Sequence, residues 1–558
     1  MTRRVLLVGA TGTFGTRLAR MLAAMPEVEL ILAARGAAKL DALHRALEAA
    51  GAVAAIRTAR LDRDAPDALT ALAPWLVIDA AGPFQGSGRD LPRAAIATSA
   101  HYIDLADGRA YVAAFPAALN AAASEAGVLA VTAASSTPAL SHAALDRMVA
   151  GWRRIDALEV AIAPGARPGP GLSVVAAILS WVGRPVRVFQ GGGWRSAPGW
   201  SGTRRIHLPG LGSRLVALCE TSDLDLLPAR FAVRDKALFL AGLEIGIMHR
   251  GLAALALPVR WGLVRSLRPL ARPLRAAAAL LAPMGGDRGG MVVAAAGADA
   301  EGRAVRARWS LRAVDGSGPS VPAAPAAALV RAMLEGRIAA TGAVACAGLL
   351  ELDAIMGELA SLPIDARADD ARPEAPILFE RLLGSRWDVL PAAVAAIHSG
   401  RTARATGRAV ARAGRGPLAR LMRASLGLPA SGPHAVAVRI RCDARGERWT
   451  RTFGRSRFAS RLEDVRGFAR FDERIGPLRF RFELRAVPRG VDWDFVGWRV
   501  LGLPMPRALG PRVRAGARDE AGRYRFRVTV GVPWGGLLFA YRGWLVPDDA
   551  GPSANAPS

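Results

Sequence analysis

A glycine-rich turn near the start of the chain is the residue pattern with the clearest chemical meaning. Glycines at positions 9, 12 and 15 form a GxxGxxG motif between the apolar run Val5–Val8 and an amphipathic helical stretch. The first glycine permits a tight turn, the second lets the backbone approach a pyrophosphate, and the third lets the helix pack closely on the strand. The free N–H groups at the helix start attract phosphate. The motif predicts a dinucleotide site at Gly9, Ala10, Thr11, Gly12, Thr13, Phe14 and Gly15; the alternative is a glycine turn without a ligand.

The end of the second apolar run indicates which dinucleotide is bound. Residues 29–34 lead to Arg35, twenty residues after Gly15, where an NAD-preferring site usually carries an acidic residue. A guanidinium suits a 2′-phosphate, and Lys39 could add a second positive charge. The predicted cofactor is therefore NADP(H), the alternative being that Arg35 is a solvated side chain. Asp62 either contacts the adenine or caps a strand.

The arrangement of apolar runs predicts the elements that position this turn. From residue 4 to about 131, short apolar runs alternate with helical patterns, which is typical of a parallel βαβ sheet. Residues 156–363 read as mixed strands and helices, and the rest as two helical patterns followed by period-two alternation. The predicted fold class is α/β: a doubly wound Rossmann domain, a mixed α/β second domain, and a C-terminal α+β domain with an antiparallel sheet.

The chain of 558 residues is too long for one hydrophobic core. Residues 366–376 are charged, contain proline and have few apolar side chains, which favours a linker. The predicted divisions are 1–150 for the nucleotide-binding domain, 151–365 for a companion or substrate domain, 366–376 for the linker, 377–548 for the β-rich domain and 549–558 for a disordered tail.

Three further segments share a resemblance with the glycine turn. They are IDAAGPF at 78–84, HYIDLADG at 101–108 and ASSTPALS at 134–141. Together they resemble the saccharopine dehydrogenase-like oxidoreductases. The resemblance implies an NADP(H)-binding fold and hydride transfer to or from an unidentified small or lipidic substrate. It also implies that a loop lies along the cofactor near its nicotinamide half, formed by Ala81, Gly82, Pro83 and Phe84.

The third domain carries a separate resemblance. Its segments FERLLGSRWDVLPAAVAAIH and YRGWLVP resemble a bacterial domain of unknown function that is often fused behind such a dehydrogenase-like module. A fusion of this kind does not specify a substrate.

The sequence does not assign a catalytic residue. The Tyr and Lys pair of short-chain dehydrogenases is absent, since neither Lys39 nor Lys236 lies four residues after a tyrosine. Cys219 and Cys346 have no basic partner nearby in sequence, so inert buried cysteines are favoured. The candidates for proton transfer, each with strand capping or packing as its alternative role, are His101, Tyr102, Asp104, Asp107 and His142.

Composition restricts the partners and the compartment. The net charge of +27 comes almost entirely from arginine, within an Ala/Arg/Gly bias typical of GC-rich bacterial coding sequences. Such a field attracts anions in general, but no nucleic-acid-binding motif accompanies it, and nucleic acid is not predicted as a partner. The three cysteines lack metal-ligand spacing, so no metal site is expected. The start of the chain has no apolar leader, which favours the cytoplasm.

Residues 237–283 are unusually apolar and also basic. On a helix, the arginines at 265, 268, 272 and 275 would fall within an arc of about 80° opposite a Leu/Ala face, although Pro269 and Pro273 would break it. The segment predicts peripheral contact with the inner membrane surface or with an acyl substrate. The alternative is packing against the second domain or a partner in a homodimer. A non-catalytic NADP(H)-binding, membrane-associated or ligand-binding scaffold is the alternative function.

Overall fold

The computed structural model describes residues 2–547, except 168, 170, 374–376, 388, 399–401, 444–445, 466–469 and 534–535. The predicted disordered tail, residues 549–558, lies outside the described residues. The chain folds into two compact units. The first unit comprises residues 1–300 and 306–372, and the second comprises 301–305 and 373–558.

A seven-stranded parallel sheet with the order β15-β6-β5-β4-β1-β2-β3 begins the first unit. Strand β1 is apolar on both faces because helices cover both sides, and Leu6 and Leu7 are fully buried. The strands are β1 (Arg3–Val8), β2 (Val28–Ala34), β3 (Ala55–Arg60), β4 (Leu76–Asp79), β5 (His101–Asp104), β6 (Leu129–Thr132) and β15 (Gly342–Ala345). The helices of this part are α1 (Thr13–Ala23), α2 (Ala37–Ala49), α3 (Leu69–Leu72), α4 (Asp90–Ala97), α5 (Arg109–Glu125), α6 (Ser141–Met148), α11 (Ala324–Leu334) and α12 (Leu352–Gly357). The strand order around β1 confirms the predicted Rossmann topology.

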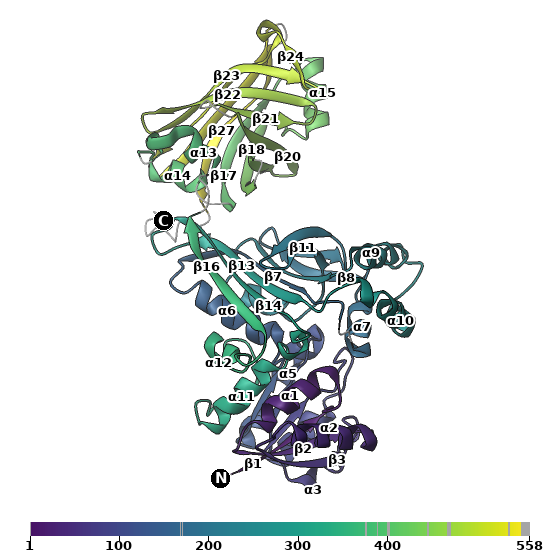
Figure 1. Cartoon of the computed structure of the whole chain (residues 1–558). Coiled ribbons are helices and arrows are strands. Elements are labelled where there is room, and N and C mark those ends of the chain that lie inside the picture. Colours follow the sequence, from purple (N-terminus) through teal and green to yellow (C-terminus); the bar gives the residue numbers. More distant parts are fainter. Residues whose placement is uncertain are drawn as a thin grey trace. The chain divides into compact units, whose positions relative to one another are not determined.

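The last strand of the first sheet comes from a distant part of the chain, residues 342–345. Strand β15 pairs in parallel with β6, and the buried helix α11 packs beside α1, where the green and purple ribbons meet in Figure 1. The predicted division at 150 and 365 therefore differs from the structure. The sequence places residues 342–345 in the second domain, but they form an edge strand of the nucleotide-binding sheet.

A nine-stranded mixed sheet forms the other half of the first unit, with the main order β10-β11-β12-β7-β13-β14-β16, with β8 beside β12 and β9 beside β8. The strands are β7 (Arg154–Ala163), β8 (Pro185–Gln190), β9 (Trp194–Pro198), β10 (Arg204–Leu208), β11 (Gly212–Leu218), β12 (Lys236–Leu243), β13 (Gly289–Ala298), β14 (Ala304–Ala313) and β16 (Ile364–Pro373). The helices are α7 (Leu172–Leu179), α8 (Asp223–Arg230), α9 (Gly246–Arg260) and α10 (Ala271–Leu281).

The predicted linker 366–376 contains the boundary between the two units at residues 372 and 373, but most of it is a strand. Residues up to Pro373 belong to β16, which pairs with β14 at the edge of the mixed sheet, and 374–376 lie outside the described residues. An edge strand tolerates charges and proline because one side of its backbone has no partner strand. Composition alone therefore made this strand resemble a linker.

Residues 237–283, all of which the structure describes, do not contain the single helix that would place the arginines at 265, 268, 272 and 275 on one face. Residues 236–243 form β12, and the rest divides into α9, a short 3-10 turn at Arg268–Leu270, and α10. Pro269 lies in the 3-10 turn and Pro273 in the first turn of α10, where a proline without an N–H is tolerated. Among the helices that the structure describes, none combines the length and apolar character needed to cross a bilayer.

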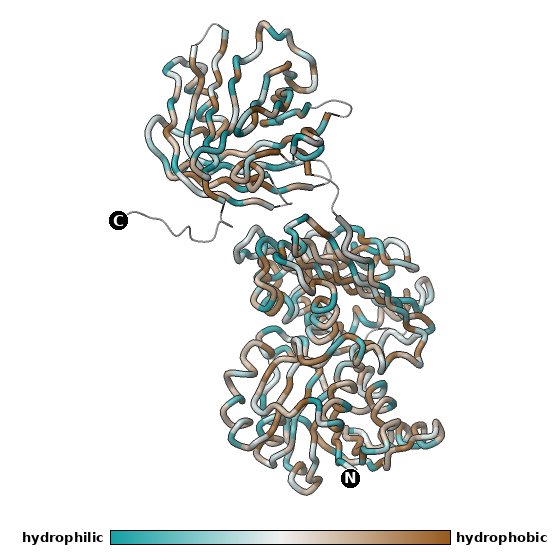
Figure 2. The backbone as a smooth tube through the Cα atoms, turned by 90° about the vertical axis from the view of Figure 1, so that its left-hand side faces the viewer, coloured by the Kyte–Doolittle hydropathy of each residue, from teal (hydrophilic) through white to brown (hydrophobic). Residues whose placement is uncertain are grey.

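The second unit is an antiparallel barrel with the order β22-β21-β20-β19-β18-β17-β27-β26-β25-β23-β24, closed by pairing of β22 with β23. Figure 2 shows short hydrophilic and hydrophobic stretches alternating along its strands. The strands are β17 (Thr402–Ala413), β18 (Gly432–Asp443), β19 (Gly446–Phe453), β20 (Ser456–Val465), β21 (Arg470–Ile475), β22 (Leu478–Val487), β23 (Gly490–Val500), β24 (Leu503–Met505), β25 (Arg512–Glu520), β26 (Arg523–Val532) and β27 (Gly536–Pro547). Its helices are α13 (Leu378–Leu383), α14 (Ala392–His398) and α15 (Pro417–Leu426). The predicted antiparallel sheet is confirmed, and its closure removes most of the exposed edges.

Candidate active site

The glycine turn connects β1 to α1, and two of its glycines are required by close backbone packing. Gly9 has φ +76°, and a Cβ there would lie 2.8 Å from the backbone nitrogen of Ala81. A Cβ on Gly15 would collide with the carbonyl oxygen of Gly9. These two positions therefore hold the turn against the loop after β4 and against the start of α1.

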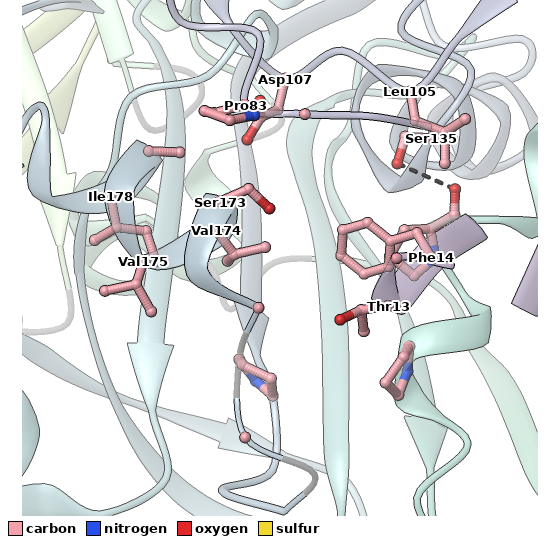
Figure 3. Close-up of a pocket in the computed structure, with 18 of the residues that line it drawn as sticks. Thr13, Phe14, Pro83, Leu105, Asp107, Ser135, Ser173, Val174, Val175 and Ile178 are labelled. Atoms are coloured by element: carbon pink, nitrogen blue, oxygen red, sulfur yellow. Dashed lines mark hydrogen bonds between the residues drawn. The ribbon is translucent and has the colours of Figure 1, made fainter. Parts of the chain in front are cut away.

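The third glycine lies at the start of α1 and faces a cavity. Gly12 is the N-cap residue and has no side-chain cap, so the first N–H groups of α1 remain available to a ligand. Thr13 and Phe14, which follow it, also line the cavity (Figure 3). Gly9 and Thr11 line the same cavity, whereas Ala10 and Gly15 are buried behind the turn. The geometry is that of a phosphate cradle.

Arg35 and Lys39 lie at the carboxyl end of β2 and in the first turn of α2. Both side chains are exposed and both residues line the cavity. Neither makes an ion pair with a residue that the structure describes. Two cations thus stand at the end of the second strand with their charges free to meet a phosphate. Asp62 also lines the cavity.

The loop after β4 is fixed by Arg63, a residue that the sequence did not single out. Its guanidinium lies 2.7 Å from Asp79 Oδ2, donates to the carbonyl oxygen of Ala81 at 3.1 Å, and stacks over the ring of Phe84. Ala81, Gly82, Pro83 and Phe84 all line the cavity. Burial raises the pKa of Asp79, and the neighbouring Arg63 opposes this shift. Arg63 therefore holds the loop in place through a buried ion pair.

Four of the five candidates for proton transfer lie away from the cavity. Asp104 accepts hydrogen bonds from Thr132 Oγ1 and from two backbone N–H groups, and burial raises its pKa to about 7. Tyr102 donates to Asp79, and His101 accepts from a backbone N–H through Nδ1. His142 is fully buried beside Asp223, 3.5 Å away. Their contacts are those of capping and packing.

The fifth candidate, Asp107, does line the cavity, where its side chain points toward the space near Pro83 (Figure 3). Its Oδ1 accepts a hydrogen bond from Gln85 Nε2 at 3.0 Å, which ties it to the loop after β4. Partial desolvation by the surrounding protein raises the pKa of the Asp107 carboxyl, although the residue keeps contact with solvent. Asp107 is the one sequence candidate that meets the predicted cofactor loop.

Glu220 is a second carboxyl group in the same cavity, and sequence reasoning missed it. It follows β11 and lines the cavity together with Asp107. Its Oε2 is buried without a hydrogen-bond partner among the described residues. Burial raises the pKa of Glu220 to about 8, the charge of Arg109 opposes the shift, and Asp107 and Asp225 add to it. Glu220 is therefore protonated at neutral pH and available to donate a proton.

The neighbouring Cys219 is unsuited to nucleophilic catalysis. Burial raises the pKa of its thiol to about 12, and the same holds for Cys346. Only a thiolate is an effective nucleophile, so both cysteines stay protonated and inert near neutral pH. Across the described part of the chain, no group of three or more His, Cys, Asp or Glu side chains is placed to hold a metal ion.

The raised pKa of Glu220 predicts a pH dependence of stability. The group titrates near 4.5 when unfolded and near 8 when folded, so the folded state binds the extra proton between these values. The free energy of unfolding should therefore fall as pH rises from 4.5 to 8, by up to about 1.4 kcal/mol per pH unit from this group. Glu220→Gln should remove this contribution, measured by denaturant unfolding at several pH values.

Glu351→Gln, at an exposed carboxylate, is the matched control. It should leave the pH dependence of the wild-type chain unchanged. Equal pH dependence of the wild type and Glu220→Gln would contradict a buried, protonated Glu220.

The whole cavity has a volume of about 1590 Å³, and the part beyond the glycine turn has an apolar wall. This wall is formed by helices α7, α9 and α10, which pack on one another. Figure 3 shows Val174 of α7 across the cavity from Thr13 and Phe14. The apolar side chains that line it include Val174, Val175, Ile178, Leu252, Leu255 and Leu274. Because ligand pockets typically measure about 300–1,000 Å³, there is room for an apolar molecule beside a dinucleotide.

Comparison with known proteins confirms both resemblances. Residues 5–131 match the family described as saccharopine dehydrogenase NADP binding domain, and residues 390–545 match a domain of unknown function, DUF4166. The first part of the chain thus matches an NADP-binding domain of the saccharopine dehydrogenase type, which supports NADP(H) as the cofactor and an NAD(P)-dependent oxidoreductase as the class of protein. No curated protein shows significant similarity to the chain.

Among solved structures, the apo form of saccharopine dehydrogenase (L-Glu forming) from Saccharomyces cerevisiae matches with a TM-score of 0.50 and 14% identity, covering 66% of this chain and 100% of the yeast chain. The DAP dehydrogenase of C. glutamicum matches with a TM-score of 0.35 and 15% identity, covering 64% of this chain and 99% of its own. At such identities the yeast match concerns the fold alone.

Proposed function

We propose that the chain is an NADP(H)-dependent oxidoreductase that transfers hydride to or from an apolar organic substrate. The observation that carries the proposal is one continuous cavity. It joins the glycine turn and the loop after β4 to a wall of aliphatic side chains from α7, α9 and α10. Hydride transfer requires the cofactor and the substrate to bind in the same cavity, and this cavity offers a phosphate-binding turn and an apolar surface.

In this proposal the chain holds the dinucleotide at three places. Backbone N–H groups around Gly12 and Thr13 bind the pyrophosphate, and Arg35 and Lys39 bind the 2′-phosphate. The loop 81–84 lies along the nicotinamide half. The residues fit the group: the start of α1 is uncapped and open to the cavity, and both cations lack an acidic partner in the described structure.

The chemistry of hydride transfer is supplied by the bound nicotinamide. The protein excludes water with its aliphatic wall and holds a proton at Glu220. For a carbonyl substrate, that carboxyl would donate its proton to the oxygen as the carbon is reduced, leaving a carboxylate that solvent reprotonates. Burial keeps the Glu220 carboxyl protonated, and the neighbouring Asp107 carboxyl adds a smaller rise of the same pKa.

The test combines two measurements on the full chain. NADPH titration should saturate at one equivalent per chain, and apolar carbonyl compounds or lipid extracts should then cause NADPH oxidation, followed by loss of absorbance at the reduced nicotinamide band. Stoichiometric binding with no oxidation across lipid extracts would favour the non-catalytic scaffold instead. Absence of NADPH binding would contradict both functions.

A further inference from the structure

The outer side of the helices that wall the cavity carries an unusual charge distribution. No acidic residue occurs between Glu244 and Asp287. The same segment contains six exposed arginines, none of which forms an ion pair with a described residue. They are Arg250, Arg260, Arg265, Arg268, Arg272 and Arg275, of which Arg268 also borders the cavity. Because no acidic side chain neutralises them, these six charges give the segment a positive potential that attracts anions.

The same segment exposes large apolar side chains to solvent. Five of them are between 67% and 81% exposed: Ile247, Trp261, Leu263, Leu280 and Met284. The two sets together are named here the α9–α10 surface. Figure 1 shows α9, α10 and their connection at the edge of the first unit. Several large apolar side chains exposed on one segment indicate an interaction site.

The exposed apolar side chains of the α9–α10 surface are not needed to complete the hydrophobic core. The inner faces of its helices are already packed, with Val259, Leu267 and Ala271 buried against Leu179 and Val182. The exposed residues therefore project from helices whose folding is complete without them. A partner must supply both an apolar phase and negative charge.

An anionic phospholipid bilayer has both properties. Arginines pair with lipid phosphates while leucine and tryptophan side chains enter the boundary between headgroups and acyl chains. Tryptophan is favoured at this depth because it is amphipathic. A protein partner would need an acidic surface with an apolar centre, whereas the charge of a bilayer is continuous and fits arginines spread over three helical pieces. We propose that the α9–α10 surface docks the chain on anionic membranes.

Docking would also bring the cavity close to the lipid. Leu252 and Leu255 of α9 and Leu274 of α10 line the cavity from the inner side of the same helices. A bilayer on the outer side would thus be separated from the apolar wall by one layer of helix. Delivery of an apolar substrate from the membrane rests on the proposed function, but docking itself does not.

The test is co-sedimentation of the full chain with vesicles of phosphatidylcholine alone or with added phosphatidylglycerol. The chain should bind only the anionic vesicles. Replacing the arginines at 260, 265, 272 and 275, none of which lines the cavity, with glutamate should lower the partition coefficient by at least about ten-fold. Because the whole chain is basic, the control replaces four exposed barrel arginines instead, at 408, 514, 527 and 542. This matched variant should retain most of the binding.

A second variant separates insertion of the apolar side chains into the bilayer from electrostatic attraction to its surface. Trp261→Ser combined with Leu263→Ser and Leu280→Ser keeps every charge but should abolish the binding that persists at about 0.15 M salt, where surface attraction is screened. Equal loss in the barrel variant, or no binding to anionic vesicles, would overturn the proposal. So would a wild-type dimer that the serine variant converts to a monomer without any vesicle binding, since a second copy would then cover the surface. NADPH titration of each variant distinguishes these results from failure of the cofactor site.

Discussion

Replacing Gly12 by alanine is expected to weaken NADPH binding by about 100-fold. The Cβ would lie 3.2 Å from the carbonyl oxygen of Gly9, a contact that small shifts can accommodate, so the fold should survive. The methyl group would occupy the side of the turn from which the pyrophosphate approaches the first N–H groups of α1. Losing one or two charge-assisted hydrogen bonds costs about 3 kcal/mol, which corresponds to about 100-fold in affinity.

Isothermal titration calorimetry with NADPH measures this effect, and thermal unfolding without ligand checks that the variant is folded. Gly357→Ala is the matched control because a Cβ there meets no atom within 4 Å and the residue lies outside the cavity. It should bind NADPH like the wild type. Wild-type affinity in a folded Gly12→Ala variant would place the pyrophosphate elsewhere.

Reversing the charge at Arg35 is expected to change the cofactor preference. In the proposed function, the preference for NADPH over NADH depends on pairing between Arg35, helped by Lys39, and the 2′-phosphate. Aspartate at 35 would repel that phosphate and accept hydrogen bonds from the ribose hydroxyls of NADH. The ratio of the two dissociation constants should shift toward NADH by about 100-fold or more, since pairing with a charged group contributes about 1.5–3 kcal/mol and repulsion adds to it.

Parallel titrations of NADPH and NADH provide the ratio. Arg45→Asp is the control, because Arg45 is an exposed arginine of the same helix α2 but does not line the cavity. The control separates a local effect on the 2′-phosphate from the general loss of positive charge. An unchanged ratio in Arg35→Asp would mean that Arg35 is a solvated side chain.

The features that sequence reasoning could predict are those with a local physical signal. The glycine turn is determined by residues within seven positions, and its context between a buried strand and a helix identified the Rossmann sheet. The position of Arg35 follows from the length of one βα unit. The period-two alternation of the C-terminal strands likewise indicated an antiparallel sheet.

Other features depend on contacts between distant segments and had no local signal. Glu220 follows a strand of the mixed sheet and meets Asp107 only because the two sheets pack together. Asp104 and Asp107 are equivalent in sequence, each near the end of β5. Only the structure separates the capped Asp104 from the cavity-facing Asp107.

The positions of β15 and β16 in the two sheets could not be predicted for a related reason. Strand β15 has four residues, too few for a pattern, and its pairing with β6 joins positions more than 200 residues apart. The charged composition of β16 satisfies an edge strand and a linker equally well. Short strands and edge strands are therefore the elements for which composition is least informative.

The most direct test of the central claim is a crystal structure of the chain with NADP⁺. The pyrophosphate should lie at the N–H groups of Thr13 and Phe14, the 2′-phosphate beside Arg35 and Lys39, and C4 of the nicotinamide in the part of the cavity that contains Asp107 and Glu220. A dinucleotide bound outside the glycine turn would contradict the account. So would a nicotinamide ring turned away from the cavity.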